Sequence, residues 1–587
     1  MSHDIRSQLE ALVKTALASV VPDSQVPALN FERPKQAAHG DFSCNVAMQI
    51  AKSLRRNPRE LATLLCAEIP ASPLIRKVEV AGGGFINFHL FPAARLAAVS
   101  QALASGATFG RSDAGSGTPV QVEFVSANPT GPLHVGHGRG AAYGASLSSL
   151  LAFAGFDVTR EYYVNDAGRQ MDILAVSTWL RYLDQLGESV PFPPNGYQGD
   201  YVRDMARKFA VMNGERCLRQ AGEVLAGTPG LPERERADDE AKQQREKHLD
   251  ALIAAGKRQL GNDWAFLHDY VLNEQMADLR DDLAGFGVEF DVWFSEQSLY
   301  DTGLVERAVK KLEAAGHIYA QNNAKWFKST VFGDEKDRCV QRENGLYTYF
   351  ASDIAYHLNK FERGFRLIID VWGADHHGYI PRVKGAVTAL GLDPVLLNVA
   401  LVQFAVLYRN GQKASMSTRS GEFVTLRELR EEVGNDACRF FYVLRKSDQH
   451  LDFDLDLAKS QSNENPVYYI QYAHARVCSM LTQWGGDEMR LVDADLAPLE
   501  SEREFALASR LGSFPDVIAA AAADLAPHTV AFYLRDLAAD FHTWYNAERV
   551  LVDDEALKLA RLALAAATRQ VIRNGLALLG VSCPESM

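Results

Sequence analysis

The stretch Ala127-Asn-Pro-Thr-Gly-Pro-Leu-His134-Val-Gly-His137 decides the fold, because it joins a buried strand to the start of a helix. The apolar run 120–125 before it predicts a strand, and the residues 138–152 after it predict a helix with one apolar side. Backbone N–H groups at a helix start are unpaired and the helix dipole is positive there, so this junction can hold a phosphate. The two histidines are three residues apart and share one face of the first helical turn.

Strands and helices alternate from residue 116 to about 460, which is typical of a doubly wound, Rossmann-like α/β domain with a parallel sheet. Ligands bind at the carboxyl ends of the strands in such domains, and the first motif lies at one of these ends. A stretch from about 190 to 290 interrupts the alternation and predicts an inserted helical subdomain. The candidate parallel strands are Val120–Val125, Thr159–Val164, Arg366–Trp372 and Val399–Leu407.

Two further units flank this α/β domain. Residues 1–115 predict an N-terminal α+β unit, in which Asn57-Pro58 is an N-cap followed by a proline at the first helical position. Within this unit 78–80 and 85–90 predict a β-hairpin or two short strands. From 461 to 587 strand signals nearly vanish, and helical periodicity predicts an all-α bundle of five or six helices.

Composition restricts the class of protein. The chain has 587 residues, 47% hydrophobic and 23% charged, so we expect a soluble globular protein with more than one core. No run of 18 apolar residues is present and no signal peptide precedes the first helix, so we expect a cytoplasmic protein without a membrane partner. The seven scattered cysteines form no CxxC pair, which argues against structural zinc. The net charge of −13 predicts moderate, salt-sensitive binding of any RNA partner through local basic patches.

By spacing alone, two histidines in a turn are more often surface or core residues without a role. The whole stretch 127–137, however, resembles the first signature of class I aminoacyl-tRNA synthetases, and its flanks resemble the arginyl-tRNA synthetase family. The likeness continues in His39-Gly-Asp-Phe-Ser-Cys-Asn45 and Gly84-Phe-Ile-Asn87, which are similar to the N-terminal domain that touches the tRNA corner in that family. Residues 541–546 and 578–587 resemble its anticodon-binding bundle.

A second motif spans 408–428. Asn410-Gly411 predicts a tight turn after a strand, and Thr425 with Glu428 predicts a capping box that opens a helix. The loop between these two signals resembles the second class I signature, a Lys-Met-Ser-Lys loop that stabilises the phosphates of ATP.

This loop departs from the family at both lysines. Ser415 and Thr418 occupy the lysine positions, and Gly131 stands where some arginyl-tRNA synthetases carry a substitute lysine. Because adenylate formation builds negative charge on the α-phosphate and on pyrophosphate, a cation must meet it. We expect Arg419 or Lys413, together with Mg²⁺ as the counter-ion of ATP, to supply that charge.

A guanidinium substrate has five donors in a planar fork and requires carboxylates. Glu123 lies within an apolar strand, where an acid is costly unless it has a partner; the alternative is an edge-strand acid that faces water. Tyr349 and Asp353 are four residues apart, so they share a helix face. The resemblance implies that these residues bind arginine, together with Ser126 and Asn128.

Further candidates follow a later strand and the start of the bundle. Residues 371–379 hold adjacent histidines without a third ligand, so we expect ribose or substrate contacts rather than a metal. Residues 465–476 interleave aromatic and basic side chains, either as bundle core or as a surface that stacks on unpaired RNA bases. The candidate anticodon-reading residues are Tyr468, Tyr469, Tyr472 and Arg476.

The resemblance implies an ATP-dependent arginine–tRNA ligase, a monomer with L-arginine, ATP and its cognate tRNA as partners, that needs tRNA for the activation step. The alternatives are another class I synthetase, such as one for cysteine or glutamate, and an RNA-binding relative without catalysis. The candidate catalytic residues are His134, His137, Arg419 and Lys413. The candidate ATP contacts are Ala127, Pro129, Thr130, Gly131, His134, Gly136, His137, Asp375, Met416, Ser417 and Thr418. The candidate arginine contacts are Glu123, Ser126, Asn128, His137, Tyr349, Asp353 and His376.

Overall fold

The N-terminal unit packs helices against an antiparallel sheet. The structure is a computed structural model that describes residues 5–21, 27–34, 39–233, 236, 238–414 and 424–587. The strand order of this sheet is β1-β2-β4-β3, and β3 and β4 form the expected hairpin. Asn57 caps α3 as expected, since its Oδ1 accepts from the backbone N of Arg59 at 2.9 Å. The elements are α1 (Ile5–Val20), β1 (Phe31–Glu32), β2 (Phe42–Cys44), α2 (Val46–Ala51), α3 (Pro58–Glu68), β3 (Ile75–Ala81), β4 (Phe85–Leu90) and α4 (Pro92–Ser105).

The middle of the chain is built on a parallel sheet with the order β12-β11-β5-β6-β7. Its strands run parallel throughout, and helices cover the sheet, so the predicted doubly wound α/β fold is confirmed. The sequence signals missed β7, which is short and half-buried along its length. The elements are β5 (Pro119–Glu123), α5 (Val135–Phe153), β6 (Asp157–Val164), α6 (Arg169–Gln185), β7 (Val292–Ser295), α13 (Tyr349–Glu362), β11 (Leu367–Gly373), α14 (Ile380–Ala389) and β12 (Leu397–Val402).

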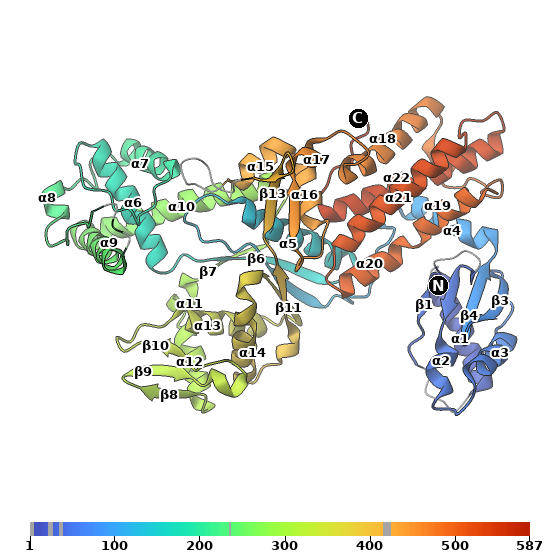
Figure 1. The fold of residues 1–587 in the computed structure, drawn as a ribbon, viewed down its shortest axis with the longest axis horizontal. Coiled ribbons are helices and arrows are strands. Elements are labelled where there is room, and N and C mark those ends of the chain that lie inside the picture. Colours follow the sequence, from blue (N-terminus) through green and yellow to red (C-terminus); the bar gives the residue numbers. More distant parts are fainter. Residues whose placement is uncertain (1–4, 22–26, 35–38, 234–235, 237, 415–423) are drawn as a thin grey trace.

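Two insertions leave this sheet at neighbouring strand ends and project to different sides (Figure 1). The first is helical and has its own apolar core, which it shares with α6. The second carries an antiparallel sheet with the order β10-β9-β8 and was not anticipated from the sequence. The elements are α7 (Asp200–Asn213), α8 (Ala221–Val224), α9 (Asp239–Leu260) and α10 (Asn262–Gly285) in the first, and α11 (Gln297–Asp301), α12 (Leu304–Ala314), β8 (Ile318–Gln321), β9 (Ala324–Phe327) and β10 (Arg338–Gln341) in the second.

The predicted strand Val399–Leu407 is wrong as a single strand. The chain leaves the parallel sheet after β12 and begins β13 (Ala405–Arg409) in a small separate sheet with the order β14-β13-β15. The tight turn at Asn410-Gly411 is confirmed, since both residues have positive φ (51° and 70°) and join β13 to β14 (Gln412–Lys413). The elements that follow are α15 (Leu426–Val433), α16 (Asn435–Val443), β15 (Leu451–Asp454) and α17 (Leu455–Lys459).

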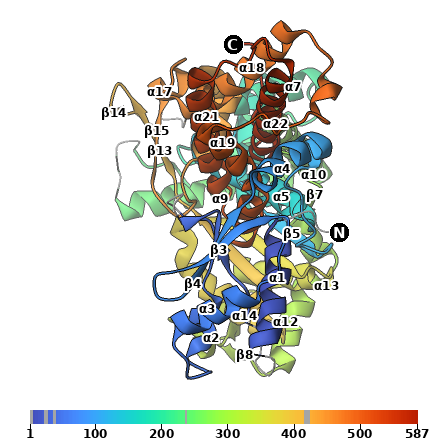
Figure 2. The same cartoon turned by 90° about the vertical axis from the view of Figure 1, so that its right-hand side faces the viewer.

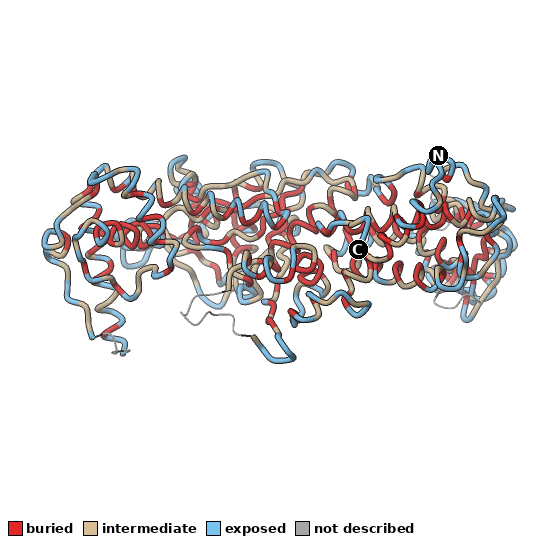
Figure 3. The backbone as a smooth tube through the Cα atoms, turned by 90° about the horizontal axis from the view of Figure 1, so that it is seen from above, coloured by how far each residue is buried: buried red, intermediate tan, exposed pale blue. Residues whose placement is uncertain are grey.

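The C-terminal bundle shares one apolar core with the parallel sheet. Buried side chains of α5 and α16 join those of the bundle helices in a single cluster. The N-terminal unit has a separate core, formed by side chains of α1 to α3 and of its sheet (Figures 1 and 2). Figure 3 shows buried residues running through the length of the molecule. Among the described residues no helix is long and apolar enough to cross a bilayer. The bundle helices are α18 (Pro466–Trp484), α19 (Glu502–Gly512), α20 (Phe514–Ala523), α21 (His528–Ala547) and α22 (Glu555–Leu579).

Helix α5 reaches the sheet closely because it carries glycines. A Cβ at Gly144 would lie 2.2 Å from the ring of Phe124, directly after β5, whereas a Cβ at Gly140 would meet nothing within 4 Å. The helix axis can therefore approach the sheet at Gly144 only without a side chain.

We predict that Gly144→Ala destabilises the protein by about 1–3 kcal/mol, because the added methyl group overpacks the α5–Phe124 contact. Gly140→Ala is the matched control in the same helix and should raise stability by up to about 1 kcal/mol through helix propensity. The midpoint of thermal unfolding of both variants measures the difference. Equal midpoints would show that the contact is not tight.

Candidate functional site

A cavity of about 460 Å³ opens at the carboxyl ends of β5, β11 and β12. In open α/β sheets this is the edge where ligands bind. The sequence signals bring together nine of its lining residues: Val125, Ser126, Ala127, Asn128, His134, Gly136, His137, Asp375 and His376. Its remaining lining residues are Gly140, Val371, Trp372, Gly373, Val402 and Phe404.

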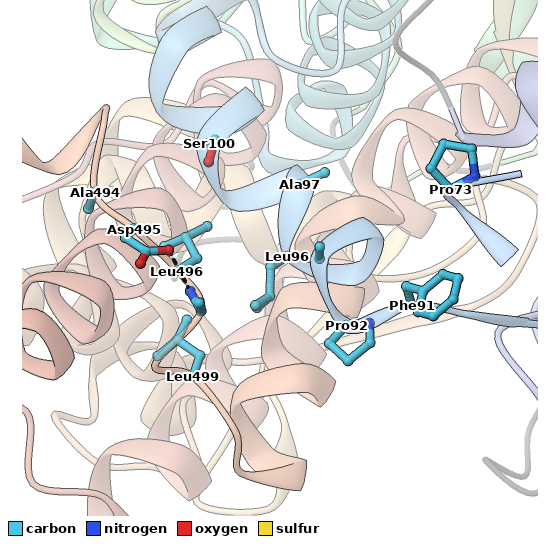
Figure 4. Close-up of a pocket in the computed structure, with 12 residues that line it drawn as sticks. Pro73, Phe91, Pro92, Leu96, Ala97, Ser100, Ala494, Asp495, Leu496 and Leu499 are labelled. Atoms are coloured by element: carbon cyan, nitrogen blue, oxygen red, sulfur yellow. Dashed lines mark hydrogen bonds between the residues drawn. The ribbon is translucent and has the colours of Figure 1, made fainter. Parts of the chain in front are cut away.

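A larger cavity of about 740 Å³ lies elsewhere, between α4 and the segment before α19 (Figure 4). Its walls are apolar, with Phe91 and Leu96 on one side and Leu496 and Leu499 on the other. The carboxylate of Asp495 accepts from the backbone N of Ala497 at 3.0 Å and so caps its own turn. This junction offers no converging polar groups, and the cavity at the sheet edge is the candidate site.

His134 and His137 form the start of α5. His134 is the N-cap, and its Nδ1 accepts from the backbone N of Gly136 at 3.1 Å. The Nδ1 of His137 accepts from the backbone N of His134 at 3.2 Å, and the two ring centroids are 3.7 Å apart. Because each Nδ1 is an acceptor, each neutral ring carries its proton on Nε2. The two rings therefore share one face of the first turn, as predicted.

Both histidines are neutral at pH 7. Burial lowers the pKa of His134, and burial together with the neighbouring ring lowers the pKa of His137 to about 3. A Cβ at Gly136 would lie 2.8 Å from the His134 ring, so glycine is required here for the capping contact itself. The arrangement presents uncharged N–H donors and a helix N-terminus to the cavity.

The loop that resembles the second signature begins and ends beside the first. Lys413 is exposed at the end of β14, and the predicted residues Ser415, Met416, Ser417, Thr418 and Arg419 lie outside the described residues. On the far side of the loop the backbone of Leu426 donates to the carbonyl of Leu133 at 2.8 Å. Thr425 and Glu428 form the predicted capping box of α15. The end of the loop is thus anchored directly against the residues that precede the histidines.

Buried Arg139 supports this anchor from the second turn of α5. Its guanidinium donates to the carbonyls of Gln403, Lys446 and Gln449 at 2.7–2.9 Å. Burial lowers its pKa to about 10, so it stays charged at pH 7. The three carbonyls belong to the segments after β12 and before β15, which Arg139 ties to the helix that bears the histidines.

The turn after β5 is strained. Val125 and Ser126 have positive φ (66° and 42°), which is unusual for any residue except glycine and most of all for a β-branched one. Ser126 Oγ donates to Glu123 Oε1 at 2.9 Å and accepts from the backbone N of Tyr163 at 3.1 Å. Strain of this kind persists where surrounding contacts enforce it, as at ligand sites. Here Glu123 enforces it through Ser126.

Glu123 does not face water, so that alternative is wrong. It lies on a central strand with 9% of its surface exposed, and its Oε2 accepts from Lys360 Nζ at 2.6 Å. The negative charge of Glu123 is therefore matched by a lysine of the protein, which the sequence signals did not reveal. The same lysine lies 2.6 Å from Asp370, whose pKa it holds at about 2 against the opposing effect of burial.

Glu296 is an acid that the sequence signals missed. It is 2% exposed and accepts from Ser352 Oγ at 3.0 Å, and it has no ion-pair partner in the described part of the chain. Burial, with the negative charges of Asp353 and Asp166, raises its pKa to about 7. No local signal could have identified it, because its surroundings come from α13 and β6.

Asp353 and Tyr349 lie on the first turns of α13, as predicted. Asp353 accepts from the hydroxyl of Tyr379, and burial raises its pKa. Tyr349 is 56% exposed and lines a cavity of about 480 Å³ that Glu296 also lines. Glu296, which has no ion-pair partner among the described residues, thus faces a space that Arg169 and Arg342 also line. Asp353 follows Tyr349 by one turn of α13.

Some of the other predicted residues line the cavity at the sheet edge and some do not. Asp375 and His376 line the cavity and lie 3.6 Å apart. Pro129, Thr130 and Gly131 do not line it; instead the hydroxyl of Tyr201, from α7, donates to the carbonyl of Thr130 at 2.6 Å. The first insertion therefore contacts the signature, a contact that no local pattern indicates.

Phe404 is a further missed residue of the cavity. It is 48% exposed at the turn between β12 and β13, and its ring approaches Gly136. An exposed aromatic ring beside this cavity offers a stacking surface. The misassigned strand Val399–Leu407 concealed this turn.

The tyrosines of α18 are half-buried, and Tyr469 packs against the bundle core. The Tyr468 and Tyr472 rings are stacked with centroids 6.1 Å apart, and the guanidinium of Arg476 lies 4.5 Å from the Tyr472 ring centroid. Tyr469 contacts His542 of α21. An aromatic surface with an arginine at its edge is thus available on the bundle.

Family comparisons cover nearly the whole chain. Residues 7–90 match the arginyl tRNA synthetase N terminal domain, residues 98–195 and 232–451 match the class I (R) tRNA synthetase catalytic domain, and residues 470–587 match the DALR anticodon binding domain. Two curated relatives are named arginine–tRNA ligase: one from Azoarcus sp. (strain BH72) with 73% identity and one from Dechloromonas aromatica (strain RCB) with 70%, each covering 100% of both chains.

The fold also matches a solved structure titled Thermus thermophilus arginyl-tRNA synthetase. The TM-score is 0.73 at 23% identity, and the match covers 99% of this chain and 100% of the other. The chain belongs to the class I arginyl-tRNA synthetase family, the arginine–tRNA ligases.

Proposed function

We propose that this chain activates L-arginine with ATP to arginyl-adenylate and pyrophosphate, then transfers arginine to the 3′ end of its cognate tRNA. The observation that carries the proposal is the stacked pair of histidines at the N-terminus of α5, against which the second signature loop is anchored. A helix N-terminus with directed, neutral donors suits nucleotide phosphates, and this supports the proposal.

Catalysis rests on positioning and electrostatics. The Nε2–H groups of His134 and His137 donate to the α-phosphate as negative charge develops in the transition state. Because both rings are neutral, they supply directed donors without requiring a protonation step. No covalent enzyme intermediate is needed.

ATP binds along the cavity, with its base near Phe404 and its ribose near Asp375 and His376. Mg²⁺ accompanies ATP, since this ion keeps to substrate phosphates and few carboxylates, and Asp375 is a carboxylate of the cavity wall. Lys413, exposed at the start of the loop, or Arg419 within it supplies the remaining positive charge. Met416, Ser417 and Thr418 complete the phosphate contacts.

The guanidinium of arginine binds between Glu296 and Asp353, with Tyr349 at the opening. Buried acids without a cation favour a cationic ligand, because an uncompensated charge in a low dielectric is costly. Glu123 is already paired with Lys360, so its role is to hold the turn at Ser126, where the reacting end of arginine lies beside Asn128.

The units at the two ends bind tRNA. The N-terminal unit (1–115) contacts the tRNA corner, and the bundle (461–587) reads the anticodon with Tyr468, Tyr469, Tyr472 and Arg476, flanking a catalytic domain of 116–460. Stacked aromatics and arginine suit unpaired bases. The enzyme acts as a cytoplasmic monomer.

Exchange of labelled pyrophosphate into ATP tests the function, with each amino acid in turn and with or without tRNA. Among the amino acids only arginine should support exchange, and it should do so only when tRNA is present. Exchange with cysteine or glutamate would indicate a different class I synthetase, and tRNA binding without any exchange would indicate a non-catalytic relative.

In the same assay Lys413→Ala and Arg419→Ala should slow exchange; two unchanged rates would refute the role of these cations.

His134→Asn separates catalysis from folding. Asparagine retains an N-cap acceptor but lacks the Nε2–H donor, so kcat for activation should fall about 10²–10³-fold while the unfolding midpoint stays the same. His134→Ala is the comparison variant, and it should also lose about 1 kcal/mol of stability with the cap. An unchanged kcat in His134→Asn would rule out phosphate stabilisation by this ring.

The pKa of about 7 at Glu296 predicts a pH-dependent affinity for arginine. Only the carboxylate pairs with a guanidinium, so the KM for arginine should fall as pH rises from about 6 to 8. Glu296→Gln should raise this KM about 10–100-fold and abolish its pH dependence. Glu289→Gln, an exposed change before β7, is the control and should leave the profile unaltered. A pH-dependent KM that persists in Glu296→Gln would assign the titration to another group.

A further inference from the structure

Three acids form a row across the parallel sheet. Asp370 on β11, Glu123 on β5 and Glu161 on β6 are direct register partners, and all three are buried. Residues in register on adjacent strands project to the same face, so three negative charges are collected on one side of the sheet. Without cations this row would be strongly unfavourable, because like charges in a low dielectric repel and lose their hydration.

Helix α13 supplies the cations. Lys360 is fully buried, and its Nζ lies 2.6 Å from both Glu123 Oε2 and Asp370 Oδ1. Arg363, at the end of the helix, donates twice to Glu161, and His357 Nε2 lies 2.9 Å from Asp370 Oδ2. These contacts attach two successive turns of α13 to three adjacent strands, β11, β5 and β6.

Lys360 differs from Arg363 in bridging two strands with one atom. A single ammonium held between Glu123 and Asp370 defines the position of the helix along its axis as well as across the sheet. Its ammonium lies over the ring of Tyr356, with Nζ 4.3 Å from the ring centroid, which leaves it little freedom. An arginine could keep both charges paired but would extend further from the helix.

The proposed arginine site extends from Asp353 to the turn at Ser126, and we call it the arginine slot. Lys360 is connected to both of its ends. Asp353 lies on the same face of α13, two turns before Lys360 and roughly 10 Å along the axis. On the other side Glu123 holds Ser126 and the strained turn at the reacting end of the slot. The separation between the guanidinium site and the turn is therefore determined by where Lys360 seats α13 on the sheet.

We propose that Lys360 is a positioning residue that sets the length of the arginine slot, and so the preference for arginine over analogues with a longer or shorter methylene chain. The inference rests on the proposed function, in that arginine is the amino acid activated. Lys360 touches neither substrate and acts through Glu123 and through the axial position of α13.

Lys360→Arg tests the proposal, with homoarginine, one methylene longer, as the probe. One methylene is worth roughly 10–200-fold in kcat/KM, so a shifted helix should change the ratio of arginine to homoarginine by about tenfold. The change should appear in the KM for the amino acid, with the KM for ATP within about twofold of wild type. Lys311→Arg on the exposed face of α12 is the matched control and should leave the ratio unaltered.

Asp370→Asn provides a second variant that keeps the Lys360–Glu123 pair and the shape of the side chain. It should shift the same ratio in the same parameter, since Lys360 is then held from one strand. Wild-type enzyme that fails to activate arginine would overturn the proposed function. Wild-type enzyme that activates arginine, with ratios unchanged in folded Lys360→Arg and Asp370→Asn, would overturn the positioning role alone.

Discussion

The row of buried acids and its cations on α13 is the constraint on which the site depends. Burying a carboxylate costs several kcal/mol unless it is paired, and three in register multiply that cost. In the described structure Lys360 and Arg363 compensate this cost. Their ion pairs define the position of α13 on the sheet. The first turn of the helix, with Asp353, is carried to the sheet edge as a consequence.

The same charge balance separates acids that are paired within the protein from acids that are not. Glu123, Glu161 and Asp370 have cations within hydrogen-bonding distance, whereas Glu296 and Asp353 have none among the described residues. Buried acids with no cation at hydrogen-bonding distance suit a guanidinium, whose delocalised charge is weakly hydrated. The raised pKa of both unpaired acids expresses the same imbalance.

A second constraint lies at the start of α5. The Nδ1 atoms of the histidines accept from backbone N–H groups at the helix start. The same hydrogen bonds therefore cap the helix and orient the Nε2–H donors. Gly136 permits this fold-back, and Gly144 lets the helix approach the sheet closely. The same side chains thus cap the helix and carry the donors that we propose to meet the phosphate.

The sequence by itself determined the features that depend on near neighbours. The β5–α5 junction, the cap at Asn57, the Asn410-Gly411 turn, the capping box at Thr425 and the fold class all follow from residues a few positions apart. Periodicity and capping act over one or two turns, which is why they can be recognised without coordinates.

Only the tertiary structure decided which acids are paired. Lys360 is 237 residues from Glu123, and Glu296 is 56 residues from Ser352, separations over which no local pattern extends. The division of Val399–Leu407 into β12 and β13, and with it the exposure of Phe404, also depended on partners elsewhere, because β13 pairs with β15. Ion pairs between distant residues and the passage of the chain from one sheet to another arise only in the packed fold. The sequence therefore shows which residues are charged, and the tertiary structure shows which charges are paired.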